Sequence, residues 1–279
     1  MRPDTKVYQG SLVGARPSRI KDMNMQDERQ AGVAETKKEE GGFLETLRVI
    51  AHALIIAVVI RTVLFQPFSI PSGSMKETLL VGDYLFVSKY SYGYSKYSIP
   101  FSPPLFSGRI MGSEPERGDI VVFKLPTDNA TDYIKRVIGL PGDKIQMIDG
   151  VLQINGKPVP KERIDDWIEE EPSGRKVRIP RFKETLPNGV VHETLDLTPN
   201  GFNDNTPVYE VPAGHFFMMG DNRDNSTDSR VQSAVGYVPY ENLVGRAEII
   251  FFSVEEGSHA WAFWEWPWSV RWSRIFNLL

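Results

Sequence analysis

One long apolar segment near the start of the chain constrains the fold more than any other feature of the sequence. Residues 49–60 are apolar apart from His52, and the apolar run resumes just after Arg61. A helix needs about 20 residues to cross the hydrocarbon core of a bilayer. Residues 43–66 reach that length if Glu45 and Arg48 lie at one interface and Arg61 extends its side chain to the other. We therefore predict a transmembrane helix over residues 43–66, ended by Pro67.

A buried helix and an amphipathic helix on the membrane surface are alternatives for the same segment. Crossing the bilayer is favoured because no other segment has helical periodicity of useful length and could pack against it. Residues 1–42 are polar and aperiodic, which predicts a disordered tail rather than a cleaved signal peptide. Lys37, Lys38 and Arg48 flank the start of the helix and favour a cytoplasmic N-terminus.

The composition argues against several classes of protein. A net charge of -4 disfavours nucleic-acid binding, which needs a basic face. The absence of cysteine rules out disulfides, thiolate zinc sites and a cysteine nucleophile. The four histidines form no HExxH pair, so a histidine-based metal site is not expected.

Beyond the helix, the chain has the pattern of a mainly β protein over residues 67–279. Asp149-Gly150 separates two strand-like runs and predicts a hairpin. Residues 152–211 are more polar and rich in Pro and Gly, which predicts a smaller β-rich insertion. The runs rich in Val, Ile, Phe and Tyr, each bounded by turn residues, are GDYLFVSKYSYGY, GDIVVFKLP, YIKRVIGL, DKIQMIDGVLQING and RAEIIFFSV.

The first of three segments that could carry chemistry is IPSGSMKETL, around Ser74. Ser74-x-x-Glu77 matches a capping box, which predicts a short helix beginning at Ser74. The same turn would expose the Ser74 hydroxyl, and a helix N-terminus offers the oriented N–H groups that an oxyanion needs. The structural and the catalytic interpretations are compatible, and both stay open for this segment alone.

The second segment is TDYIKRVIGLPGD, with Lys135 at its centre. On a strand, Tyr133, Lys135 and Val137 share one face. A lysine in this pattern is usually solvated at the edge of a sheet. Burial would instead lower the pKa of the lysine and provide a neutral amine near pH 7, which can act as a general base.

The third segment is GDNRDNSTDSR, residues 220–230. Its density of Asp, Asn and Ser is typical of a turn-forming loop. A calcium-binding loop does not fit. Counted from Asp224, the sixth residue is Ser229 rather than Gly, and the twelfth is Val235 rather than Glu.

Other arrangements with a serine nucleophile fit poorly. The chain has no GxSxG motif. The SxxK pairs Ser18/Lys21 and Ser173/Lys176 lie in polar segments without supporting context. A Ser-His-Asp triad would need a histidine, and His215 is the only one near any of the three segments.

Taken together, the three segments resemble those of type I signal peptidases (leader peptidases), which are serine proteases with a Ser/Lys dyad. PSGSM followed by TLL, GDYLFV, RGDIVVFKLP, YIKRVIGLPGD and GDNRDNSTDSR occur in that family's order, just after an apolar segment. The resemblance covers roughly residues 66–150 and 211–250. It implies a membrane-bound endopeptidase that removes signal peptides from exported preproteins after a small-x-small (A-x-A) motif, through an acyl-enzyme.

The resemblance also implies roles for individual residues. Ser74 would be the nucleophile and Lys135 the general base, with the Ser72 hydroxyl and the Ser74 N–H as the oxyanion hole. No metal or cofactor would be needed. The residues that would support the dyad are Ser226, through a hydrogen bond to the Lys135 amine, and Asp228 and Arg230, which would brace the loop. The residues that would line the substrate pockets are Phe68, Ile70, Pro71, Met75, Leu79, Val122, Tyr133 and Ile134.

The same resemblance implies a fold and a location. It predicts a mostly antiparallel β catalytic domain on the periplasmic side of the cytoplasmic (inner) membrane, with a single-pass anchor. Exported preproteins and the lipid bilayer would be the partners, with the secretion translocon as a further one.

Two other classes of protein are weighed against this interpretation. A self-cleaving Ser/Lys repressor would carry a helical DNA-binding domain where this chain has a tail and an apolar helix. A non-catalytic, membrane-anchored β scaffold derived from a peptidase would be supported by the loss of Ser74 or Lys135, and both are present.

One position departs from the family pattern. Type I signal peptidases commonly have proline where this chain has Glu77. Proline would fix the turn after the nucleophile, whereas glutamate would rely on the capping box. We therefore expect Glu77→Pro to be neutral.

The C-terminal end is rich in tryptophan. Indole rings beside arginines favour the headgroup region of a membrane, which predicts a second membrane contact. The alternative is that the rings cover an apolar face of the β domain. The residues concerned are Trp261, Trp264, Trp266, Trp268 and Trp272, beside Arg271 and Arg274.

Overall fold

The apolar segment forms one long helix. The structure is a computed structural model that describes residues 42–170 and 174–279, so the tail predicted over residues 1–42 lies, except for Gly42, outside the described residues. Helix α1 (Gly42–Val63) is the one helix in the described ranges that is long and apolar enough to cross a membrane, and none of its side chains is buried. Its 22 residues extend ~33 Å, compared with ~30 Å for a hydrocarbon core.

The end of α1 differs from the prediction. The helix stops at Val63 rather than at Gln66, because residues Phe65–Ser69 form strand β1 and pair with strand β2 (Asp83–Ser88). Pro67 lies within β1, which is an edge strand, where a missing N–H is tolerated. Strand pairing, and not Pro67, therefore sets the end of the helix.

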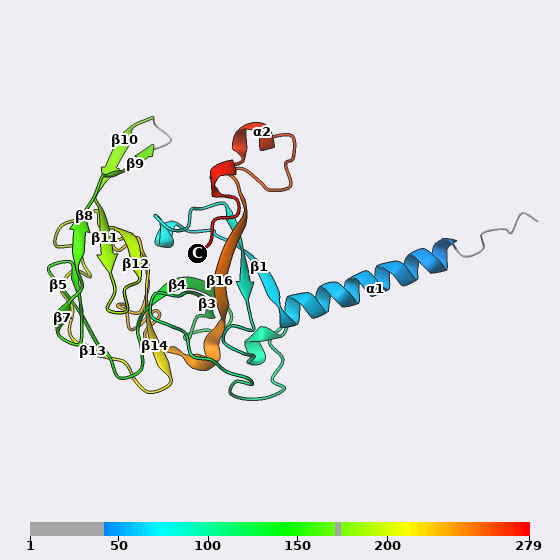
Figure 1. Ribbon diagram of the computed structural model, residues 1–279, viewed down its shortest axis with the longest axis horizontal. Coiled ribbons are helices and arrows are strands. Elements are labelled where there is room, and N and C mark those ends of the chain that lie inside the picture. The colour runs from blue at the N-terminus through cyan, green and yellow to red at the C-terminus, as the bar shows by residue number, and fades with distance from the viewer. Residues whose placement is uncertain (1–41, 171–173) are drawn as a thin grey trace, which may run out of the picture. The chain divides into compact units, whose positions relative to one another are not determined.

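A seven-stranded antiparallel sheet forms the body of the protein (Figure 1). Its strand order is β1-β2-β16-β3-β4-β14-β15. The fold is therefore mainly antiparallel β, which confirms the predicted class. The remaining strands of the sheet are β3 (Ile120–Lys124), β4 (Asp132–Gly139), β14 (His215–Met219), β15 (Val238–Pro239) and β16 (Leu243–Ser253).

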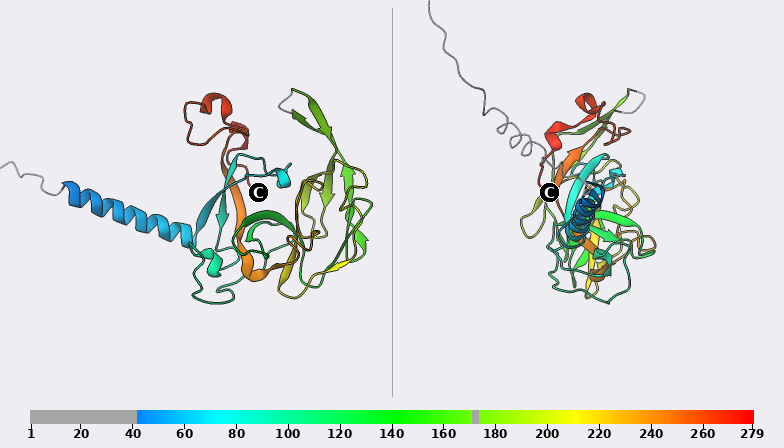
Figure 2. Two further views of the ribbon diagram at one scale, coloured as in Figure 1. Left: turned by 180° about the vertical axis from the view of Figure 1, so that it is seen from behind. Right: turned by 90° about the vertical axis from the view of Figure 1, so that its right-hand side faces the viewer.

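The chain between β4 and β14 forms three smaller antiparallel sheets, with strand orders β13-β5-β6-β7, β12-β11-β8 and β10-β9. Figures 1 and 2 show these strands gathered on one side of the seven-stranded sheet. The Asp149-Gly150 hairpin between β5 and β6 is present, and both residues have positive φ, 48° and 72°. The strands are β5 (Lys144–Ile148), β6 (Val151–Ile154), β7 (Lys157–Pro158), β8 (Lys161–Arg163), β9 (Trp167–Glu170), β10 (Lys176–Ile179), β11 (Arg181–Thr185), β12 (Val191–Leu195) and β13 (Tyr209–Glu210).

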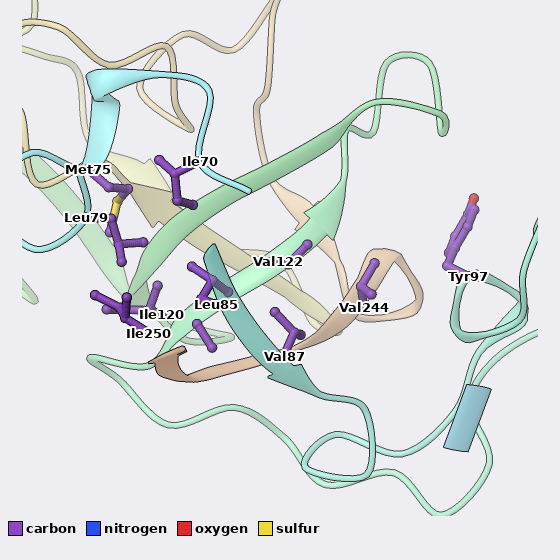
Figure 3. Close-up of a cluster of buried hydrophobic side chains, with 11 residues drawn as sticks. Ile70, Met75, Leu79, Leu85, Val87, Tyr97, Ile120, Val122, Val244 and Ile250 are labelled. Atoms are coloured by element: carbon purple, nitrogen blue, oxygen red, sulfur yellow. The ribbon is translucent and has the colours of Figure 1, made fainter. Parts of the chain in front are cut away.

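A core cluster lies directly beneath the turn that follows β1. Met75 and Leu79 of this turn are completely buried and belong to one cluster with Leu85, Ile120 and Ile250, as Figure 3 shows. Burying two such side chains contributes about 1.5–3 kcal/mol each. The segment that carries Ser74 is therefore anchored to the core immediately after the serine.

The C-terminal segment runs back along β16 and contains the short helix α2 (Trp266–Ser269). Trp266 packs on Phe252 with ring centroids 5.0 Å apart, whereas Trp261, Trp264, Trp268 and Trp272 are exposed. Contrary to the expectation from the sequence, the two arginines of this segment do not face solvent. Arg271 and Arg274 form ion pairs with Asp83, whose side chain is fully buried, because that carboxylate needs positive partners.

Candidate active site

The predicted nucleophile lies in a tight turn. Residues Gly73–Met75 form a single 3-10 turn that begins after Ser72, and no side chain caps it. The predicted capping box is therefore absent, because Ser74 lies inside the turn. The Glu77 carboxylate instead accepts a hydrogen bond from Arg181 (3.1 Å), and Glu77 has a positive φ of 25°.

Strand β4 brings Lys135 to this serine. The Lys135 Nζ lies 2.7 Å from Ser74 Oγ and 2.9 Å from the carbonyl oxygen of Ile134. Lys135 is 3% exposed and Ser74 8% exposed. In the part of the chain that the structure describes, the Ser74 hydroxyl has hydrogen-bond contacts with Lys135 and Ser72 and with no histidine.

Burial sets the protonation of the lysine. It lowers the pKa of Lys135 from 10.5 to about 8, although the charges of Asp228 and Asp221 act in the opposite direction. The Nζ also lies over the Tyr133 ring, 5.2 Å from its centroid. Near neutral pH, a usable fraction of the amine is therefore free to accept the proton of the Ser74 hydroxyl.

Two adjoining cavities open beside the pair. The first, called here the Ser74 cavity, measures about 380 Å³ and is lined by Ser72, Ser74, Lys135 and neighbouring residues. The second, called the apolar cavity, measures about 310 Å³. Of the residues predicted to line substrate pockets, those on the surface of one or both cavities are Phe68, Ile70, Pro71, Val122, Tyr133 and Ile134.

Met75 and Leu79 line neither cavity. Their side chains are completely buried in the core cluster beneath the turn. Any effect of these two residues on the pockets is therefore indirect, through the position of the turn.

The loop of residues 220–230 packs against the backbone of the nucleophile. The Asn222 backbone N–H donates to the Ser74 carbonyl (3.1 Å), and the Asn222 side-chain amide donates to the Gly73 carbonyl (3.0 Å). A Cβ atom on Gly220 would lie 2.5 Å from the Ser74 carbonyl oxygen. Only glycine at position 220 allows this close approach. The loop therefore holds the nucleophile through hydrogen bonds to the backbone carbonyl oxygens of Gly73 and Ser74.

Asp228 and Arg230 hold this loop together. The Asp228 carboxylate accepts the Gly220 N–H (3.0 Å) and pairs with the Arg230 guanidinium (2.8 Å). Burial by itself would raise the pKa of Asp228, but the charge of Arg230 lowers it overall, so Asp228 stays anionic. The geometry is that of a brace within the loop.

Ser226 does not make the expected hydrogen bond to Lys135. Its hydroxyl is buried and makes no hydrogen bond of normal geometry among the described residues, although it lies close enough to Asp228 to help lower the pKa of that carboxyl. The Ser226 Oγ lies against Gly220, where an added Cβ would approach it to 2.2 Å. Packing, rather than a bond to the amine, therefore fixes Ser226 here.

Known proteins that resemble this chain are signal peptidases. The family model described as signal peptidase, peptidase S26, matches residues 43–252. A signal peptidase I from Rickettsia typhi is 46% identical over 248 residues, covering 81% of this chain and 90% of the relative. A signal peptidase I from Rickettsia conorii is 42% identical over 275 residues, covering 91% and 97%.

The chain belongs to the signal peptidase family. It is therefore a serine endopeptidase of the signal peptidase I type. A crystal structure of a signal peptidase I from Enterococcus faecalis is also similar, with 26% identity, a TM-score of 0.29, and coverage of 48% of this chain and 97% of that one.

A second charged network in this signal peptidase was not predicted from its sequence. Arg136, next to Lys135, donates to both oxygens of Asp221 (2.9 and 2.7 Å), and Thr78 donates to the same carboxylate (2.5 Å). This network joins β4, the loop of residues 220–230 and the turn after Ser74. The sequence offered one signal for this network. Arg136 and Asp221 have opposite charges, and each lies within one of the recognised motifs.

Strands of the smaller sheets also reach the loop of residues 220–230, called here the catalytic loop of this signal peptidase. Arg223 forms a bidentate ion pair with Glu184 of β11 (2.7 and 2.5 Å), and both side chains are buried. His192 lies 3.6 Å from Glu184, and burial lowers the pKa of His192 to about 4, so it stays neutral. The sequence placed Glu184 and His192 in a polar insertion and gave no sign of this contact.

Among the described residues of this signal peptidase, three aspartates lie close enough together to be considered as a metal site. The carboxylates of Asp196, Asp204 and Asp224 lie within 4.8 Å of one another. Lys161 pairs with Asp196 (2.5 Å), and Asp224 accepts the backbone N–H groups of Leu197 and Thr198. These contacts explain the three aspartates as a structural link between loops. None of the three lines the Ser74 cavity.

Proposed function

We propose that this chain removes signal peptides from exported preproteins with Ser74 as nucleophile and Lys135 as general base. The observation that carries the proposal is the 2.7 Å separation of Lys135 Nζ and Ser74 Oγ in a buried site. Family membership supports the substrate class, because the relatives are named signal peptidase I.

The mechanism follows from the geometry. Neutral Lys135 takes the proton of the Ser74 hydroxyl as its oxygen attacks the carbonyl carbon at the end of the signal peptide. The Ser72 hydroxyl, whose oxygen lies 3.5 Å from Ser74 Oγ, and the Ser74 N–H stabilise the oxyanion. Protonated Lys135 then gives its proton to the leaving amine, and water releases the signal peptide from the acyl-enzyme.

The cavities support the small-x-small preference. The residue before the cleaved bond would lie in the Ser74 cavity, beside Ile134 and Pro71. The residue two positions earlier would lie in the apolar cavity, beside Phe68 and Val122, because alternate side chains of an extended chain share a face.

The remaining roles concern position. Asp228 and Arg230 support the loop that holds Ser74, and Ser226 packs beside the dyad. We expect Ser226→Ala to reduce turnover less than Ser74→Ala, because among the described residues the Ser226 hydroxyl makes no hydrogen bond to Ser74 or Lys135.

The apolar helix supports membrane anchoring, and the location follows from it. We propose a single-pass protein of the cytoplasmic membrane, with residues 1–42 in the cytoplasm and residues 67–279 on the periplasmic side. The lipid bilayer and the secretion translocon are the proposed partners. Protease added to spheroplasts should digest the large domain and spare the tail, and protection of the large domain would overturn this orientation.

Cleavage by the purified full chain tests the function. A preprotein with an A-x-A site should be cut once, directly after the second small residue, as shown by the mass of the mature product. Ser74→Ala should leave it intact, whereas Ser107→Ala, in an exposed loop, should cut normally. A wild-type chain that cleaves no preprotein would favour the non-catalytic scaffold instead.

A further inference from the structure

The Ser74 cavity lies in the middle of a row of four cavities. It shares Asp132 and Ile134 with the apolar cavity. Asp132 also lines a small cavity of about 160 Å³, which shares Gln66 with the apolar cavity and not with the Ser74 cavity. In the other direction the Ser74 cavity shares Asn225 with a cavity of about 350 Å³. This last cavity, called here the Lys76–Glu169 cavity, shares no residue with the apolar cavity, so the two lie beyond different parts of the Ser74 site.

The anchor helix gives the row a direction. The small cavity is lined by Arg61, which belongs to the last turn of α1. A signal peptide that is held in the bilayer reaches the site from the membrane, and therefore from the end of the row that carries Arg61. The part of the substrate after the cleaved bond must leave past Asn225, into the Lys76–Glu169 cavity.

The Lys76–Glu169 cavity differs in chemistry from the apolar cavity. It is lined by Asn222, Asp224 and Asn225 from the catalytic loop, and by Lys76, two residues after the nucleophile. Its far wall includes Glu169 of β9, whose carboxylate lies 2.6 Å from Lys76 Nζ.

The charge balance of this lining is negative. Two carboxylates, Glu169 and Asp224, face one ammonium group, Lys76. Asp224 is engaged with the backbone of residues 197 and 198, and Glu169 pairs with Lys76, but the Glu169 side chain remains 36% exposed in spite of that pair. Glu169 is therefore the carboxylate best placed to meet a charged side chain of a bound peptide.

We propose that the Lys76–Glu169 cavity binds the first residues of the mature protein, directly after the cleaved bond, and that Glu169 sets the charge preference at these positions. The inference rests on the proposed function of the Ser74–Lys135 pair. It makes the smaller sheets part of the substrate site, since β9 supplies one wall.

A matched set of substrates tests the subsite. The full chain in detergent is given preproteins that are identical up to the cleaved bond and carry Lys, Gln or Glu at the second and third positions after it. The wild type should have a higher kcat/KM for the Lys substrate than for the Glu substrate. Glu169→Lys should change this ratio by at least about fivefold towards the Glu substrate, an effect limited by solvent screening of the charges. Glu169→Gln should change it by less, because it removes the negative charge without reversing it.

Glu170→Lys is the control, because it makes the same charge change on the same strand, where alternate side chains point to opposite faces. It should leave the ratio unchanged, and no variant should alter the preference for alanine before the cleaved bond. Equal ratios in Glu169→Lys and Glu170→Lys would overturn the proposal.

Binding separates this proposal from the proposed function. The Ser74→Ala full chain should bind the Lys substrate more tightly than the Glu substrate, and adding Glu169→Lys should reverse that order. If Ser74→Ala still cleaves, the catalytic assignment fails. If Ser74→Ala is inactive and its affinity does not respond to Glu169, only the subsite is rejected.

Discussion

At the scale of single residues, one buried amine determines what the site can do. Lys135 has lost nearly all contact with water, and this lowers its pKa to about 8. Burial of an ammonium group opposes folding, so the fold maintains Lys135 at some cost in stability. A side chain retained under such a cost points to a role in the reaction.

Lys135→Arg should abolish cleavage almost as completely as Lys135→Ala. A guanidinium keeps its proton at any working pH and cannot accept the proton of Ser74. Single-turnover cleavage of a preprotein measures this, with Lys144→Arg, an exposed position on β5, as the control. Near-normal turnover in Lys135→Arg would mean that another residue is the base.

Glu77→Pro should destabilise the protein, contrary to the expectation from sequence. Glu77 has a φ of 25°, and proline is restricted to about −65°. The substitution also removes the Glu77 carboxylate, and with it the hydrogen bond that Arg181 donates. We expect a loss of more than about 1 kcal/mol in the free energy of unfolding.

Glu77→Gly is the comparison for this change, because it removes the same carboxylate but accepts a positive φ. Thermal unfolding should rank Glu77→Pro below Glu77→Gly. Equal stability of Glu77→Pro and wild type would show that the turn relaxes to a negative φ.

At the scale of elements, most strands were predictable because the residue types within each short segment already indicate a buried strand. GDIVVFKLP became β3 and YIKRVIGL became β4, since Val, Ile and Phe in short runs fit a buried pleated surface. The Asp149-Gly150 hairpin was equally clear, because its two positive φ values suit those residues. The family motifs likewise located Ser74 and Lys135 before any geometry was known.

What could not be predicted depends on partners distant in sequence. Strand β1 contains Pro67 and looks like the end of a helix, yet pairing with β2 decides its structure. Ser74-x-x-Glu77 looks like a capping box, yet Arg181, far along the chain, takes the carboxylate. Local propensity is overridden in both cases by tertiary contacts, which a motif of a few residues does not contain.

The ion pair between Glu184 and Arg223 should be important for the docking of β11 on the catalytic loop. Arg223→Met would leave the fully buried Glu184 carboxylate without its partner, at a cost on the order of 3 kcal/mol. The double variant Glu184→Leu/Arg223→Met removes both charges and should be more stable than the single variant. Urea unfolding measures the difference, with Lys183→Met, exposed on the same strand, as the control.

A double variant no more stable than Arg223→Met would contradict this account. Stability would then depend on the packing of the two side chains and not on the unpaired charge.

At the scale of the whole molecule, the C-terminal segment is the candidate for a second membrane contact. Four of its tryptophans are exposed, between 52% and 70%. Because Arg271 and Arg274 pair with Asp83, we now expect the indole rings rather than the arginines to drive binding. A truncated chain beginning at Leu64 should bind neutral vesicles nearly as well as anionic ones, with a blue shift of tryptophan emission.

Replacing Trp261, Trp264, Trp268 and Trp272 with glutamine should remove that binding without unfolding the domain. An emission spectrum of the truncated chain that vesicles do not change would reject the contact. Binding only to anionic vesicles would return the role to basic side chains.

The measurement that tests the central claim most directly is the pH dependence of cleavage. Lys135 must be neutral to act as base, so kcat/KM should be low while the amine is protonated and should rise with pH through an apparent pKa near 8. Above that pH it should reach a plateau, well before the ordinary pKa of lysine. A rise through about 6.5, as for an unperturbed histidine, or a rise that continues through about 10.4, would contradict the buried Lys135 base.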